Sequence, residues 1–324
     1  MRIKRALILS VFLFFSPITV YAQDELILGG NSVGIEIQYD GVYVSGTYPI
    51  NDQIDPADTF LPGDIIKTIE NQPIHDLSTF YAVLKEYTDP INVLDITIQR
   101  NHSLIDATMK TAYDHNRHSM SCGLYIKEKM SGVGTMTFYD PSTKRFAALG
   151  HAIEQVDEEP IGNLYDAQII DYTKATTGAT GEKKADIQYD EVIGIIDQNT
   201  SIGIYGNYQI IPSETRSLPW ADVDEVKLGK ASIYTVLEDQ TIESYEIMIT
   251  KLNAHTQDDM KGIAFQVIDE RLLGQTGGII QGMSGSPIVQ NGKIIGAVTH
   301  VVTDSPENGY GVFVEYMLHH TRSS

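Results

Sequence analysis

Apolar and polar residues alternate in short segments over most of the chain, and a period of two is typical of β-strands. Between residues 30 and 110 the alternation runs on both sides of Asp40 and Gly41, which predicts a β-hairpin at that dipeptide. Residues 76–87 break the alternation, because Asp76 can cap a helix and apolar residues then recur on one face. This part of the chain therefore predicts several strands and one helix.

The second part of the chain, from residue 123 onward, is rich in predicted strands. Segments rich in β-branched and aromatic residues are separated by Gly, Asn and Asp; they are residues 132–140, 146–153, 191–197, 201–211, 232–237, 244–252 and 262–269. Short strands with turn residues between them favour an all-β barrel or sandwich. Residues 111–122 are polar and have no pattern, so we interpret them as a linker between a domain at 30–110 and a domain at 123–324.

The first 22 residues have the three parts of an export signal. Residues 1–5 are basic, an apolar stretch follows, and Val20-Tyr21-Ala22 fits a cleavage site for signal peptidase. We therefore expect export across the cytoplasmic membrane. The alternative is an uncleaved membrane anchor at residues 6–22, because about 17 residues lie at the lower limit of a membrane span.

Composition narrows the classes of function. The chain of 324 residues carries a formal net charge of −20, which repels nucleic acid, so we expect no DNA or RNA partner. The single cysteine, Cys122, permits no intrachain disulfide, and we expect a small buried hydrophobic residue there rather than a nucleophile. The sequence has neither an EF-hand pattern nor a zinc-ligand cluster, so we expect no metal.

The segment Gly282–Pro287 (GMSGSP) lies between two apolar segments and is longer than a plain hairpin turn requires. A serine becomes a nucleophile only when a base takes its proton, and the tetrahedral intermediate needs two converging N–H donors. Glycines let the backbone curl so that the amides of Gly282 and Ser284 can form this oxyanion hole. The pattern resembles the nucleophile loop of trypsin-like serine proteases, with Ser284 as the nucleophile and Ser286 structural. The alternative is a plain glycine-rich turn.

The general base must be one of nine histidines. Most of them lie in the N-terminal domain, the linker, a polar loop or the C-terminal tail. His151 follows small residues (FAALG) that let the backbone pass close to a neighbouring loop, whereas His300 ends an apolar segment. We favour His151 as the base, and the alternative is His300, which could instead be a core or substrate-wall residue.

Residues 30–110 resemble a bacterial PDZ domain of the kind attached to secreted proteases. The resemblance rests on a Gly-Ile pair in the first strand, on the sequence PGDIIKTIENQPI from Pro62, and on the helix that follows. Such a domain binds an extended peptide by adding it as a strand, and backbone amides capture the terminal carboxylate. The amides here would be those of Ser32, Val33, Gly34 and Ile35. The alternative is a domain that only packs against its neighbour.

Three longer segments resemble the SpoIVB peptidase family of spore-forming bacteria, and the resemblance spans nearly the whole chain. These segments are residues 132–153, 267–301 and 304–318. The family has a catalytic histidine in an LGH segment, an aspartate before RLL, and the serine of GMSGSP. The resemblance therefore implies a catalytic triad of His151, Asp269 and Ser284.

The role of the aspartate is the least specific part of this resemblance. Asp269 would accept the Nδ1–H of His151, fix the tautomer and stabilise the imidazolium. Glu270 stands where the family usually has a proline after this aspartate. The rivals for the role are Asp157, Asp166 and Asp171. A further alternative is a structural aspartate that caps a turn.

Together these features predict a mainly β protein with an N-terminal PDZ-like domain, containing one or two helices, followed by a trypsin-like β-barrel serine protease domain. The resemblance implies an exported serine endopeptidase that needs no metal or organic cofactor. Such enzymes are released between mother cell and forespore, cleave themselves, and then cleave a membrane-bound regulator. That cut lets an intramembrane protease activate a late sporulation sigma factor.

Two other functions also fit the sequence. A catalytically idle relative would use only a PDZ-type groove to bind the C-terminus of a partner, but the presence of both His151 and Ser284 favours an enzyme. A quality-control protease of the cell envelope, similar to the HtrA group, would carry its PDZ domain after the protease domain. The predicted order in this chain is the reverse.

Overall fold

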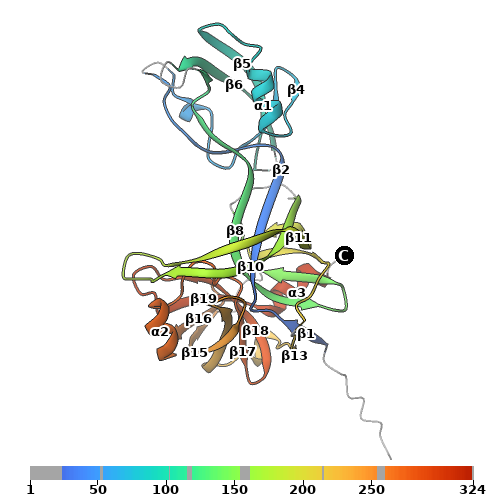
Figure 1. The fold of residues 1–324 in the computed structure, drawn as a ribbon, viewed down its shortest axis with the longest axis vertical. Coiled ribbons are helices and arrows are strands. Elements are labelled where there is room, and N and C mark those ends of the chain that lie inside the picture. The colour runs from blue at the N-terminus through green and yellow to red at the C-terminus, as the bar shows by residue number, and fades with distance from the viewer. Residues whose placement is uncertain are drawn as a thin grey trace, which may run out of the picture.

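The computed structural model describes residues 24–51, 54–101, 103–114, 119–153, 161–213, 215–253 and 260–322. Most described residues lie in strands, which confirms the expected mainly β fold. A small domain contains helix α1 (Leu77–Leu84), and two long strands, β2 (Ser32–Thr47) and β8 (Leu124–Asp140), join it to a larger body (Figure 1). Helices α2 (Glu270–Thr276) and α3 (Val314–Arg322) belong to the larger body.

The larger body contains two barrels. In the first, β2 pairs with β8, and a closed circuit of pairings runs from β8 back to β2 through β9 (Arg145–Ala148), β12 (Gly203–Tyr208), β11 (Glu182–Thr200) and β10 (Ile161–Thr173). The apolar residues of these strands form one buried core, which includes Ile35, Met136, Phe146, Leu164 and Ile204. The alternation in the sequence is therefore the alternation between this core and the outer face of the barrel.

The second barrel is closed by six strands in the order β14 (Gly229–Val236), β15 (Ile242–Leu252), β16 (Ile263–Val267), β19 (Asn308–Phe313), β18 (Lys293–Val301) and β17 (Pro287–Gln290). The predicted strands at 232–237, 244–252 and 262–269 correspond to β14, β15 and β16, so these predictions are confirmed. Helix α3 packs against strands of both barrels, and the Nε of Arg322 donates a 2.8 Å hydrogen bond to buried Asp140 at the end of β8.

Two further short strands and two 3-10 turns lie outside the two barrels. Strands β1 (Glu25–Leu28) and β13 (Ser217–Pro219) extend the first sheet beside β8, and two 3-10 turns lie at Pro56–Asp58 and Val223–Glu225. Among the described residues, no helix has the length and apolar character required to cross a membrane.

The small domain is a sheet covered by α1. Its strands are the second half of β2, β3 (Ile65–Ile69), β4 (Gln72–Pro73), β5 (Ile91–Arg100), β6 (Ser103–Asp114), β7 (Ser119–Ser121) and the first residues of β8. The predicted helix is confirmed, because Asp76 caps α1 by accepting a 2.7 Å hydrogen bond from the amide of Thr79. Buried Asp64 holds the turn before β3, since its carboxylate accepts two 2.6 Å hydrogen bonds from Arg100.

The predicted hairpin at Asp40 and Gly41 is wrong, because β2 continues through both residues as one strand. Gly41 has φ of 140°, and the pairing with β8 shifts register between Gln38 and Tyr43. The strand therefore contains an irregularity where a turn was expected, and its two halves belong to different domains. A period of two has the same appearance in a hairpin and in one long strand, so the sequence could not separate them.

The assignment of a peptide-binding edge to Ser32–Ile35 is also wrong. These residues pair with β8 on one side and, from Val33 onward, with β10 on the other. Their backbone lies inside the first barrel and offers no open edge to a peptide. The small domain is thus inserted between two strands of the first barrel and does not precede the peptidase domain as a separate unit. A peptide ligand for the small domain stays a prediction.

The predicted linker at residues 111–122 is mostly strand. Strand β6 continues to Asp114, and β7 (Ser119–Ser121) pairs with it. Cys122 follows directly and is buried, and burial raises the pKa of its thiol to about 11. A thiol with this pKa is protonated at neutral pH, which agrees with the expected role of Cys122 as a small buried hydrophobic residue.

Candidate active site

The loop that carries Ser284 precedes β17 and lies between the two barrels. Gly282 and Gly285 have φ values of 90° and 92°, which favour glycine over residues with a side chain. A Cβ at Gly285 would lie 2.0 Å from the carbonyl oxygen of Thr135, so this position also has no room for a side chain. Backbone conformation therefore favours glycine at both positions beside the serine, and at Gly285 the lack of space requires it.

Strand β8 of the first barrel holds this loop through three hydrogen bonds. The amide of Thr135 donates to the Ser284 carbonyl oxygen at 3.0 Å, and the Oγ1 of Thr135 donates to the Gly282 carbonyl oxygen at 2.7 Å. The Oγ1 of Thr137 donates to the Gly285 carbonyl oxygen at 2.8 Å. These bonds turn the carbonyl groups of the loop toward β8, so the loop conformation depends on the first barrel.

The two amides predicted to form the oxyanion hole are available. The amides of Met283, Gly285 and Ser286 all donate to backbone carbonyl groups, at 3.1, 2.7 and 2.9 Å. In the described part of the chain, the amides of Gly282 and Ser284 have no acceptor. Free N–H groups beside a nucleophile are what an oxyanion hole requires.

The hydroxyl of Ser284 donates a hydrogen bond to the carbonyl oxygen of Thr299 at 2.9 Å. Thr299 lies in β18, directly before His300, and its own Oγ1 donates to the Met260 carbonyl oxygen at 2.7 Å. The Ser284 hydroxyl therefore rests on a backbone carbonyl of the second barrel. The other serine of the motif, Ser286, is completely buried, which agrees with a structural role.

His151 reaches the same region from the first barrel. It follows β9 after a tight turn at Leu149 and Gly150, whose φ values are 70° and 69°. Its Nδ1 donates to the carbonyl oxygen of Ala152 at 2.7 Å, so the tautomer carries its proton on Nδ1 and leaves Nε2 free to accept one. Burial lowers the pKa of His151 below its ordinary value of 6.5, which keeps the ring neutral at pH 7.

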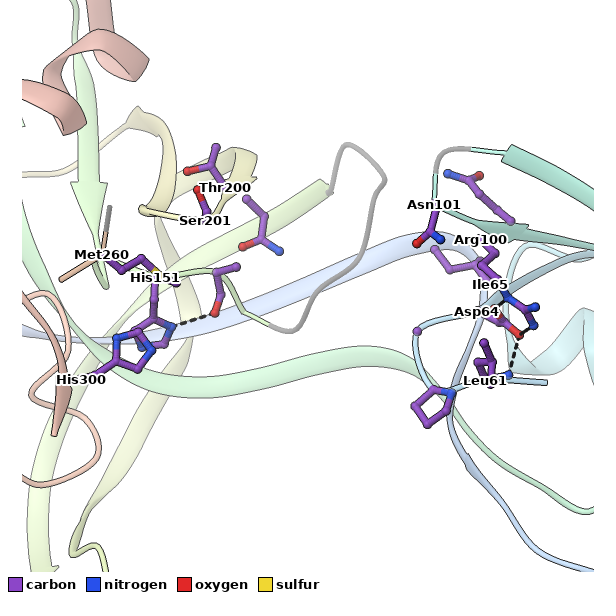
Figure 2. Close-up of a pocket in the computed structure, with 15 residues that line it drawn as sticks. Leu61, Asp64, Ile65, Arg100, Asn101, His151, Thr200, Ser201, Met260 and His300 are labelled. Carbon is purple, nitrogen blue, oxygen red and sulfur yellow. Dashed lines mark hydrogen bonds and ion pairs between the residues drawn. The ribbon is translucent and has the colours of Figure 1, made fainter. Parts of the chain in front are cut away.

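His300 is the neighbour of His151. The centroids of the two rings are 5.4 Å apart, and the labelled rings lie side by side in Figure 2. Both residues line a cleft of about 800 Å³ that also includes Leu61 and Asn101 from the small domain. Burial, together with the nearby His151 and Lys261, lowers the pKa of His300. The alternative base from the sequence thus lies in the wall of the same cleft.

The structure brings His151 and Ser284 into one region but forms no hydrogen bond between them among the described residues. Each has a backbone carbonyl as its partner, Ala152 for the histidine and Thr299 for the serine. Hydrogen bonds between catalytic groups are often formed only when substrate binds. The chemical parts of an acyl-transfer site are therefore present: a serine hydroxyl, a neutral imidazole with a free nitrogen, and two free amides.

Asp269 has a different place from the one that the family resemblance implies. Its carboxylate caps α2 by accepting hydrogen bonds from the amides of Arg271 and Leu272 at 2.9 and 3.3 Å. It also accepts from the amide of Glu246 and the guanidinium of Arg271, both at 3.2 Å. Burial raises the pKa of Asp269, but these hydrogen bonds outweigh burial and hold it below 3.8. Membership of Asp269 in a triad stays a prediction, and the observed contacts are those of a helix cap.

The rival aspartates have other partners. Asp166 accepts from the side chain of Gln240, and Asp171 pairs with Lys184 at 2.9 Å. Asp157 lies outside the described residues. The Ala152 carbonyl occupies the position at Nδ1 of His151 that a triad acid would take.

Removal of the Asp269 carboxylate is expected to destabilise the fold. Asp269→Ala loses the cap of α2 and should lower the free energy of unfolding by about 1 kcal/mol, as measured by denaturant titration. Asp269→Ser retains a capping oxygen and should keep most of the stability. An unchanged free energy of unfolding in Asp269→Ala would contradict the cap. A loss of kcat of about 10⁴-fold in stably folded Asp269→Ser would place the residue in the triad.

Several residues at the site had no signal in the sequence. Thr135 and Thr137 contact the serine loop from β8, which is far away in the chain, and Thr299 contacts it from β18, 15 positions after Ser284. Each has the appearance of an ordinary strand residue. No local pattern marks a threonine whose partner is decided by the packing of two barrels. Among the described residues, no group of three or more His, Cys, Asp or Glu side chains is placed to hold a metal ion.

The family of SpoIVB peptidase S55 matches residues 118–318, which are more than half of the chain. The chain belongs to this family. The protein is therefore a serine peptidase, and the matched residues include β9 with the following His151, and the whole of the Ser284 loop. The resemblance that the sequence predicted is confirmed at the level of the family.

The peptidase is also similar to solved structures. The PDZ domain of an SdrC-like protein from Listeria monocytogenes is 20% identical, over 27% of this chain and 88% of that chain, with a TM-score of 0.24. The Rv3671c protease from M. tuberculosis in its active form is 12% identical, over 58% of this chain and 72% of that chain, with a TM-score of 0.30. No curated protein matches the chain. The functional assignment rests on the family.

Proposed function

We propose that the peptidase is an endopeptidase in which Ser284 is the nucleophile and His151 is the general base. The observation that carries this proposal is the junction of the two barrels, where the serine loop and the His151 turn meet. A Cβ atom placed on Gly150 of that turn would lie 3.1 Å from the carbonyl oxygen of Val298. The next residue, Thr299, accepts the hydrogen bond of the Ser284 hydroxyl. A substrate bound at this junction would meet both groups at once.

The catalytic step follows from the hydrogen bonds of the resting site. A bound peptide bond would draw the Ser284 hydroxyl away from the Thr299 carbonyl oxygen and toward Nε2 of His151. Nε2 then takes the proton as Oγ attacks the scissile carbonyl carbon, and the new oxyanion accepts hydrogen bonds from the amides of Gly282 and Ser284. The imidazolium gives the proton to the leaving amine. The Ala152 carbonyl supports this step by holding the Nδ1–H.

The biological setting is a second part of the proposal. The export signal expected at residues 1–22, which lie outside the described residues, supports a location outside the cytoplasmic membrane, as a free or an anchored protein. Membership in the SpoIVB family supports a role in sporulation signalling. We propose that the protein cleaves itself and a membrane-bound regulator of an intramembrane protease, in the space between forespore and mother cell.

Labelling by a fluorophosphonate tests the chemistry. The wild-type protein, residues 23–324, is expected to gain the probe on Ser284, and its mass is expected to fall over hours as it trims itself. The variant Ser284→Ala should show neither change. Peptide mapping of the labelled protein identifies the modified residue. A label on another residue, or equal trimming of both proteins, would contradict the proposal.

A further inference from the structure

Lys183 is a buried lysine beside the serine loop. It lies near the start of β11, where the first barrel meets the second, and only 2% of its surface is exposed. Its Nζ donates a 2.8 Å hydrogen bond to the Oγ1 of Thr235, a fully buried residue of β14 in the second barrel. Among the described residues, no carboxylate forms an ion pair with it. Lysine is almost never fully buried without such a partner, so its position calls for another explanation.

The backbone of Lys183 is joined to the segment that leads into the oxyanion amides. Its amide donates to the carbonyl oxygen of Gln281 at 3.0 Å, and the amide of Gln281 donates to the Gly181 carbonyl oxygen at 2.8 Å. The start of β11 thus acts as an extra strand along the serine loop. This contact ends one residue before Gly282, whose amide is free.

The side chain of Lys183 packs directly behind Gly282. A Cβ placed on Gly282 would lie 3.0, 3.1 and 3.2 Å from the Cδ, Cβ and Cγ atoms of the lysine. The amine is only two bonds beyond that Cδ. The alkyl chain therefore forms a wall that limits how far Gly282 can move, and Lys183 lines the same pocket as Gly282.

We propose that Lys183 is a positioning residue of the peptidase: it supports the Gly282 amide from behind and, when protonated, brings a positive charge close to the oxyanion. This inference rests on the proposed function of Ser284 and His151. Lys183 itself does not contact the substrate, and its effect passes through Gly282. A positive charge in a water-poor site stabilises a developing negative charge more than it would in water.

Burial, rather than a neighbouring charge, determines when Lys183 is protonated. Tyr172 lies opposite it in β10, Glu182 precedes it, and Glu243 lies opposite Thr235 in β15. None of the three forms an ion pair with Lys183, and Glu182 is exposed at the edge of a pocket of about 420 Å³ that includes Lys183 and Gly282. Burial lowers the pKa of Lys183 to about 7.

The protonation states of His151 and Lys183 set the expected pH dependence. His151 must be neutral to act as a base, so kcat/KM rises with pH through the lowered pKa of His151. Lys183 must be protonated to help, so kcat/KM falls again as pH rises through about 7. The two groups together predict a narrow maximum of kcat/KM, since the pKa values of the free enzyme govern this ratio.

The test measures hydrolysis of a peptide substrate by the protein of residues 23–324 and compares the variants Lys183→Met and Lys184→Met. Methionine keeps the alkyl wall and removes the amine, and Lys184 is the adjacent exposed lysine of the same strand. Lys183→Met is expected to lower kcat about tenfold at the optimum, to change KM little, and to lose the alkaline fall. Lys184→Met should behave as the wild type. Equal kcat and an identical pH profile in Lys183→Met would overturn the inference.

A second variant keeps the test decisive if Lys183→Met does not fold. Thr235→Val preserves shape and removes the only hydrogen-bond acceptor that the amine of Lys183 has among the described residues. The protonated amine then loses a partner, so the alkaline fall should move to lower pH, and an unmoved fall would also overturn the inference. A wrong assignment of the proposed function would be recognised separately, because the wild type itself would then show neither turnover nor fluorophosphonate labelling of Ser284.

Discussion

Replacement of Ser284 by alanine is expected to lower kcat for peptide hydrolysis by about 10⁴-fold or more. The physical reason is the loss of the nucleophile, for which the loop offers no substitute, because Ser286 is completely buried. The fold should survive, since the variant loses one hydrogen bond, to the Thr299 carbonyl oxygen, which contributes about 1 kcal/mol or less. Initial rates with a fluorogenic peptide and a thermal unfolding curve measure the two effects.

The matched control is Ser286→Ala, in the same loop. The hydroxyl of Ser286 is buried and has no hydrogen-bond partner among the described residues. Its removal should therefore leave the free energy of unfolding nearly unchanged and kcat within about twofold of the wild type. A Ser284→Ala protein that retains activity would contradict the assignment of the nucleophile. A Ser286→Ala protein without activity would show that any substitution in the loop abolishes activity. The loss of activity in Ser284→Ala would then not identify the nucleophile.

Gly285→Ala is expected to have the largest effect on stability. A Cβ there would lie 2.0 Å from the Thr135 carbonyl oxygen and 2.5 Å from the Leu149 amide nitrogen, and both are backbone atoms that cannot turn away. The φ of 92° adds strain for any residue with a side chain. We expect a loss of about 3 kcal/mol in the free energy of unfolding, together with the loss of activity. Denaturant unfolding followed by fluorescence measures the first.

Gly274→Ala is the control for this substitution. Gly274 lies in α2, and a Cβ there would meet no atom within 4 Å. Alanine is the better helix former, so this variant should be as stable as the wild type or more stable by up to about 1 kcal/mol. Equal stability of Gly285→Ala and the wild type would contradict the close approach of the serine loop to β8 and the His151 turn.

Both predictions depend on the contact between barrels. Thr135 and Thr137 of the first barrel hold the carbonyl groups of the serine loop, and Lys183 supports it from the other side. Ser284 lies in the loop before β17 of the second barrel, and His151 follows β9 of the first. A small displacement of the barrels would therefore change the distance between Ser284 and His151 without unfolding either barrel.

Local features of the chain were predicted well from the sequence. The strands of the second barrel follow from their alternation, α1 follows from the Asp76 cap, and the glycine requirement follows from the GMSGSP segment. These features depend on residues a few positions apart, and their physical causes, capping, alternation and backbone freedom, act over the same short range. The close backbone approach at His151 and Ser284 also depends on the residue types around each, whereas their catalytic roles stay a prediction.

Other features could not follow from the sequence. The path of β2 through Asp40 and Gly41 depends on β8, which pairs along both halves of the strand from about 90 positions away. The same pairing buries the backbone of Ser32–Ile35 in the first barrel and inserts the small domain between two of its strands. A period of two shows that a strand has a buried face, but it does not show which strands lie beside it.

The sequence by itself determined the class of the protein: a mainly β serine peptidase with a glycine-lined nucleophile loop and one favoured histidine. The tertiary structure alone decided how the small domain is inserted, that Asp269 caps α2, and that Ala152 holds Nδ1 of His151. It also decided that Lys183 lies behind Gly282. For the insertion and for Lys183 the physical reason is range, because a motif acts through its neighbours in the chain, whereas these contacts join residues that only the folded barrels bring together. The capping contacts of Asp269 and the Nδ1 contact of His151 are with residues one to three positions away, but a motif does not show which of several local partners a side chain takes.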